Sequence, residues 1–181
     1  MLLSLFGTEA MGGKGVKQTD IETTILRSLY EAWFSPQGGS NLDQLRNQRG
    51  WDTKESEKTV TGMAADGFIQ ERTADTWKLT TLDVVIWLED RGIAPEEALR
   101  ENEHIRTLAL NALHKLHREK GRRAEADAYS PAERLGVGPL ELVTNLVVLE
   151  HSGEVENTTA VFWRITNEGT DAVRRQKPAA N

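Results

Sequence analysis

The stretch from Ser130 to Gly169, SPAERLGVGPLELVTNLVVLEHSGEVENTTAVFWRITNEG, decides the fold that we predict for this chain. It opens with the signals of a helix N-terminus: a serine N-cap, a proline at the first helical position and a glutamate three residues after the serine. Two glycines interrupt that helix, and apolar residues at helical spacing then predict a second one. Val155 and the run Val161–Trp163 predict two strands around a polar tip.

The first half of the chain repeats this pattern. At an offset of 86 residues, Trp77–Thr80 falls on Trp163–Thr166, with matching tryptophans and threonines at the two ends. Farther upstream, the apolar residues of Ile21–Leu29 match those of Ile105–Leu113 at an offset of 84. A difference of two residues is an ordinary change in loop length. We therefore expect two tandem domains of one kind, joined by a helical linker.

The predicted fold class is mainly α with small β wings (α+β). Pro95 opens a long helix that ends at Gly121, and the glycine-containing segment 91–94 separates the halves. Ser40 and Asp43 are expected to cap the helix that contains Leu42, Leu45 and Trp51. We place a flexible lead at 1–18, the first domain at 19–92, the second domain with the long helix at 93–175, and a tail at 176–181. The other predicted helices of the chain cover about 21–34, 54–66, 83–90 and 168–175.

Composition limits the class of protein. The chain has 181 residues, of which 38% are hydrophobic and 28% are charged, as in globular proteins with one large or two small domains. The absence of cysteine excludes disulfides and cysteine-ligated metals, and it fits a cytoplasmic location. No apolar run approaches the length of a membrane span, so we expect no membrane partner.

The motifs resemble the winged-helix form of the helix-turn-helix domain found in MarR/PadR-like bacterial regulators. PAERLGV (Pro131–Val137) is similar to the positioning helix, LEHSGEV (Leu149–Val155) to the end of the recognition helix, and WRITNEG (Trp163–Gly169) to the strand that leaves the wing. With its repeat, the resemblance covers the chain from about Thr19 to Arg175. It implies a DNA-binding regulator in which the third helix enters a groove and the wing contacts phosphate.

In the first half, the third helix and the wing carry the residues expected at a DNA surface. Glu55 and Glu57 lie between the basic residues, so a solvated helix with short-range ion pairs is the alternative interpretation. The candidate DNA-binding residues are Lys54, Lys58, Thr61, Arg72, Lys78, Arg46 and Arg49.

The second half differs at the equivalent positions. At the 86-residue offset, Lys54 becomes Leu140 and Gly62 becomes Val148, which predicts a partly apolar outer surface. Glutamates in the second wing would repel phosphate. We therefore expect Leu140 and Val148 to form an interface with protein.

A basic cluster lies at the end of the long helix and in the loop after it. Such residues stabilise a helix C-terminus through its dipole, and they are also candidate phosphate anchors. His114 and His117 lie one turn apart without a carboxylate at suitable spacing, so no metal site is predicted. The candidate phosphate anchors are Lys115, Arg118, Lys120, Arg122 and Arg123.

Two function hypotheses follow. The first is a regulator that binds double-stranded DNA through the first domain and forms a homodimer through the second domain and the long helix. The second is a protein-binding adaptor made of tandem winged helices, as in ScpB-like accessory subunits of chromosome condensation complexes. The net charge of −6 favours the adaptor, and the third helix of the first half favours DNA. No catalytic constellation or nucleotide-binding glycine loop is found, so we expect neither an enzyme nor a cofactor.

Overall fold

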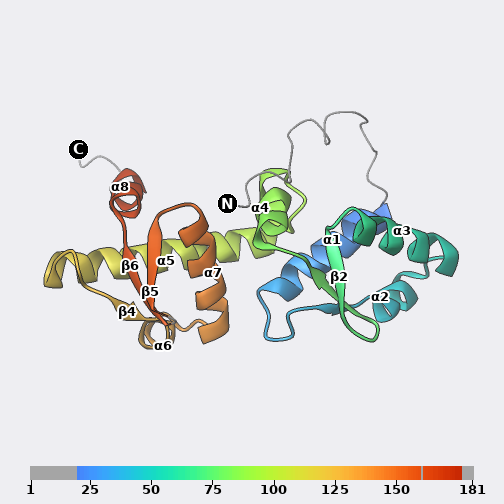
Figure 1. The fold of residues 1–181 in the computed structure, drawn as a ribbon, viewed down its shortest axis with the longest axis horizontal. Helices are drawn as coiled ribbons and strands as arrows, with labels where there is room; N and C mark the ends of the chain where they lie inside the picture. The colour runs from blue at the N-terminus through green and yellow to red at the C-terminus, as the bar shows by residue number, and fades with distance from the viewer. Residues whose placement is uncertain (1–19, 160, 177–181) are drawn as a thin grey trace.

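The computed structural model describes residues 20–159 and 161–176, which form two successive helical halves, each with a small three-stranded antiparallel sheet (Figure 1). The predicted lead at residues 1–18 and all but the first residue of the predicted tail, 176–181, lie outside the described residues. Helices make up most of the described chain, so the α+β class is confirmed.

The first half begins with a helix most of whose buried residues belong to the apolar core of that half. Its elements are α1 (Asp20–Trp33), β1 (Ser40–Asn41), α2 (Leu42–Arg49), α3 (Thr53–Ala65), β2 (Ile69–Thr73), β3 (Thr76–Leu79) and α4 (Leu82–Asp90).

The second half begins with the long helix α5 (Glu96–Lys120), which has the predicted ends. The elements that follow it are β4 (Ala126–Asp127), α6 (Tyr129–Leu135), α7 (Pro139–His151), β5 (Val155–Thr159), β6 (Phe162–Ile165) and α8 (Asn167–Gln176).

Two short strands that the sequence did not predict change where two helices start. Ser40 pairs with Trp77 in β1, so it does not cap α2; Asn41 does, and its side chain accepts a hydrogen bond from the Gln44 amide at 2.7 Å. In the same way, β4 pairs with β6, and the Ala128 amide donates to the Val161 carbonyl. The helix α6 therefore starts at Tyr129, and its predicted N-cap, Ser130, lies inside the helix.

The internal repeat extends to the register of the sheets. Ile69 lies opposite Leu79, and Val155 lies opposite Ile165, 86 residues farther along in both strands. Both ribbons also have a register shift at the equivalent place, before Thr73 and before Thr159. The two halves therefore share one backbone plan down to single residue pairs.

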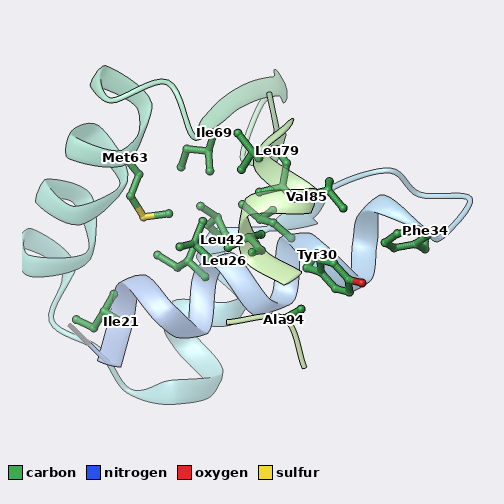
Figure 2. Close-up of a cluster of buried hydrophobic side chains, with 14 of the residues drawn as sticks. Ile21, Leu26, Tyr30, Phe34, Leu42, Met63, Ile69, Leu79, Val85 and Ala94 are labelled. Atoms are coloured by element: carbon green, nitrogen blue, oxygen red, sulfur yellow. The ribbon is translucent and has the colours of Figure 1, made fainter. Parts of the chain in front are cut away.

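Each half has its own apolar core. In the first, Leu26, Met63, Ile69 and Leu79 converge on one side of α1 (Figure 2). The second surrounds the part of α5 that starts at Ile105. The first core extends beyond the predicted boundary at residue 92, because Ala94 and Val148 belong to it, and Ile93 and the α5 residues Ala98 and Leu99 pack against it. One continuous helix therefore carries both cores.

Gly169 marks the closest backbone approach in the second half. A Cβ at this position would lie well inside the van der Waals contact distance from the Glu154 carbonyl oxygen and 2.8 Å from Ile165 Cγ1. We predict that Gly169→Ala lowers the free energy of unfolding by about 1–3 kcal/mol in urea denaturation. Gly62→Ala in α3 is the matched control. The added Cβ would meet no atom within 4 Å, and alanine is the more favourable residue inside a helix, so the free energy of unfolding should rise by about 0.5–1 kcal/mol. Equal stability of Gly169→Ala and wild type would contradict this close approach.

Candidate nucleic-acid interface

The outer face of α3 brings three predicted residues together. Lys54, Lys58 and Thr61 follow one another at a spacing of about one helical turn, so they share a face, and all three are exposed. Neither lysine forms an ion pair with a described residue. On the opposite side, buried Ser56 and Met63 hold α3 against the core. The face is thus rigidly supported and open to solvent.

The other predicted contacts are distributed differently. Arg46 forms an ion pair with Asp43 of the same helix at 2.8 Å and a longer one with Glu57 of α3 at 3.9 Å. Its positive charge is therefore already compensated by two carboxylates. The Arg72 guanidinium donates a hydrogen bond to the Gln37 carbonyl, which attaches the β2–β3 ribbon to the loop after α1. Lys78 is half-buried, whereas Arg49 is exposed. The structure therefore leaves Arg49 and the α3 face available for phosphate.

The basic cluster of α5 does not extend this surface. Lys115, Arg118 and Lys120 lie at the end of α5 that is farthest from the first half, and α3 lies at the opposite end of the molecule (Figure 1). A helix as long as α5 spans about 38 Å at 1.5 Å per residue. The loop residues Arg122 and Arg123 follow directly and are exposed. The cluster and the α3 face are therefore two separate basic surfaces of one chain rather than one continuous patch.

The helix equivalent to α3 in the second half, α7, is partly covered by the first half. Val148 is only 7% exposed and belongs to the first core, so the prediction that it offers a surface to a separate partner is wrong. Its apolar side chain is instead buried within the same chain. His151 Nε2 also lies 3.9 Å from Asp83 Oδ1 of α4. Leu140, in contrast, is 50% exposed, and its role at a protein interface stays a prediction.

The second wing also carries no free cation at the position equivalent to Lys78. Arg164 donates a hydrogen bond to Glu156 on the neighbouring strand. That hydrogen bond lowers the pKa of the Glu156 carboxyl, so the pair is ionised and self-compensated. The second half is therefore the poorer candidate for DNA contact.

A buried polar network, which sequence reasoning missed, joins the halves around Glu89 of α4. The Tyr30 hydroxyl donates to Glu89 Oε1 at 2.7 Å. Arg106 of α5 donates two hydrogen bonds to the same carboxylate, at 2.7 and 2.8 Å. Its Nε donates to Asn145 Oδ1 of α7 at 2.9 Å. Arg106 thereby connects α4 of the first half with α7 of the second.

Two asparagines complete this network. The Asn145 amide donates to Asn102 Oδ1 and to the Glu141 carbonyl, both at 3.1 Å. Asn102 in turn donates to the Tyr30 hydroxyl at 3.3 Å. Asn145 has no exposed surface, so each of these bonds replaces one that water would otherwise make. The members therefore depend on one another for hydrogen-bond partners.

The network fixes the charge states of its members. Burial raises the pKa of Tyr30 above that of a free tyrosine, and its hydrogen bond to Glu89 raises it further. Burial alone would lower the pKa of Arg106, but the hydrogen bonds and charge of Glu89 outweigh it and raise that pKa. At neutral pH the network thus holds a neutral phenol and a charged guanidinium.

One sequence signal for this network was present. Asn145, together with Thr144, interrupts an apolar helical run, LVTNLVVL (Leu142–Leu149), and a buried amide requires partners. Asn102 and Arg106 are one turn apart on α5, which is a weaker signal. Glu89 lies in the last turn of α4, where the helix dipole disfavours an acidic residue, and this is also only a weak signal.

Comparison with known proteins gives no identification: no protein-family model matches the chain, and neither curated proteins nor solved structures give a match. Within residues 20–159 and 161–176, no group of three or more His, Cys, Asp or Glu side chains is placed to hold a metal ion. None of the helices in this part combines the length and apolar content that a membrane span requires.

The buried pair gives a first test of the network. In Glu89→Ala, Arg106 keeps its charge in a site where its side chain is only 12% exposed, so we predict a loss of about 3–5 kcal/mol in the free energy of unfolding. Asp171→Ala, which breaks the exposed pair with Arg174, is the control and should cost less than about 1 kcal/mol. Similar losses in the two variants, measured by urea denaturation, would refute a structural role for the network.

The raised pKa of Tyr30 gives a second test. The folded state holds the phenol proton of Tyr30 more tightly than the unfolded state, and this difference stabilises the fold. The stabilisation is complete below pH about 10, where the unfolded tyrosine is still protonated, and is lost as the pH rises above that value. We predict that the free energy of unfolding falls more steeply above pH 10 in wild type than in Tyr30→Phe. Tyr129 is present in both proteins and cancels in the comparison. Parallel curves from urea denaturation between pH 8 and 11.5 would show that Tyr30 titrates normally.

Proposed function

We propose that the chain is a tandem winged-helix protein whose first half binds double-stranded DNA through α3. The exposed face of Lys54, Lys58 and Thr61 carries this proposal. Support for the fold comes from the repeated order of helix, short strand, two helices, ribbon and helix, with the same strand registers in both halves. The resemblance of the sequence motifs to those of MarR/PadR-like regulators also supports a winged-helix protein that binds DNA.

In the proposed complex, α3 lies along the major groove. Lys54 and Lys58 bind phosphates at the groove edge, Thr61 faces base edges, and Arg49 contacts the backbone from the end of α2. The net charge of −6 opposes binding at long range, so the local face must outweigh it near the duplex. The second half holds the first rigidly through the buried network. A homodimer through the second half would bind palindromic half-sites, and the absence of cysteine fits a regulator in the cytoplasm.

The duplex proposal predicts salt-dependent binding. Fluorescence anisotropy of a labelled random-sequence duplex should show binding at about 50 mM salt and a steep loss at about 200 mM, because bound counterions are released on association. Lys54→Ala/Lys58→Ala should weaken binding and reduce the salt slope by about 2, roughly one for each phosphate contact.

The control is Arg174→Ala/Arg175→Ala, which removes two positive charges, as the lysine variant does, but from exposed positions on α8. It should change binding much less than the lysine pair. Equal losses in the two variants would indicate a general charge effect and refute recognition by α3. Unchanged anisotropy at high micromolar protein would refute duplex binding.

A second candidate function is the protein-binding adaptor, and one observation favours it. Among the described residues, the large apolar side chains that remain exposed are Leu140, Val161 and Phe162. At the 86-residue offset these positions correspond to Lys54, Asp75 and Thr76 of the first half. The second half thus has apolar side chains where the first half has polar ones, at the start of the third helix and at the ribbon tip. Such a substitution suits contact with protein.

A further inference from the structure

A groove between the two halves combines apolar walls with an open side. It has a volume of about 610 Å³ and is formed by the end of α1, the start of α5 and the start of α7. Phe34 and Pro36 contribute from the first half, and Pro139 and Leu140 from the second. Leu140 is half exposed, so one wall keeps apolar surface in contact with water. Covering that wall with another apolar group would be favourable.

The charge of this groove is of one sign. Glu31, Glu97, Glu101 and Glu141 line it, and no lysine or arginine does. None of the four carboxylates forms an ion pair with a described residue. Low-dielectric walls concentrate the field of such a group of like charges. The groove therefore repels nucleic acid and favours a cationic occupant.

The groove is also held in shape. Its lining includes Asn102, which is bonded to Tyr30 and Asn145 in the buried network. The Glu141 carbonyl accepts from Asn145, and the Arg106 guanidinium lies 6.0 Å from the centre of the Phe34 ring. A site that is rigid before binding loses little entropy when it is occupied. Both halves are required for it, because neither contains all of its walls.

We propose that this groove binds a basic peptide segment of a partner protein, with an apolar side chain against Leu140 and lysine or arginine side chains toward the glutamates. The inference rests on the second candidate function and names its partner chemistry; it does not depend on duplex binding. Charge complementarity selects this occupant over an acidic or neutral segment.

The test uses the full chain and a labelled twelve-residue peptide of lysine and leucine, followed by fluorescence anisotropy. Binding should be saturable, and it should weaken at least tenfold in Glu97→Gln/Glu101→Gln. Glu96→Gln/Glu103→Gln is the matched control, with the same charge change at exposed sites of the same helix outside the groove. That control should stay within twofold of wild type. Leu140→Ser should weaken the leucine-containing peptide at least fivefold and leave a lysine and serine peptide unaffected.

Each alternative result has one meaning. Equal weakening by the two glutamine pairs would show binding to the general acidic surface and would overturn the proposal, as would no saturable binding. Unfolding midpoints of all variants, measured in the same buffers, identify any loss that comes from unfolding. Lys54→Ala/Lys58→Ala should bind the peptide like wild type. Peptide binding and duplex binding can therefore fail separately.

Discussion

The buried Glu89–Arg106 pair is the interaction on which the arrangement of the two halves depends. A lone charge in this position would be very unfavourable, so the pair is stable only when α4 and α5 meet with good geometry. Tyr30 and Asn145, which belong to different halves, form further hydrogen bonds with the pair. Apolar contacts between the halves, such as Val148 in the first core, act together with these directional hydrogen bonds. Together they set the relative placement of α3, α7 and the groove.

The two halves show how one backbone plan can carry opposite surfaces. Their sheets have the same register, and the hydroxyl of Thr80 or Thr166 bonds the equivalent carbonyl, that of Gly67 or Gly153. Those features are set by the backbone and the core, which both halves preserve. Exposed positions are not constrained in this way. The first half keeps lysines on α3, and the second uses the same helix partly to pack against its neighbour.

This division of roles explains why a chain of net charge −6 can still be proposed to bind DNA. Four glutamates line the groove between the halves, but Glu55 and Glu57 lie on α3 itself, so the exposed lysines must outweigh them locally. The α3 face lies at the other end of the first half from the second half, so the repulsion is partly screened at physiological salt, where the Debye length is about 8 Å. Both proposed activities therefore fit in one molecule on separate surfaces.

The sequence by itself determined the helices, the two ribbons and their repetition, but not the short strands β1 and β4. Helix periodicity and glycine stops located α5 and α7, and the offset between Trp77 and Trp163 located the second ribbon, because these signals depend only on nearby residues. The sequence also identified Lys54 and Lys58, which are exposed on α3. Only the tertiary structure decided that Val148 is covered, that Arg46 is held in ion pairs, and that Glu89, Arg106 and Asn145 meet. Those contacts join residues distant along the chain, and whether a side chain is free or paired depends on which element packs against it.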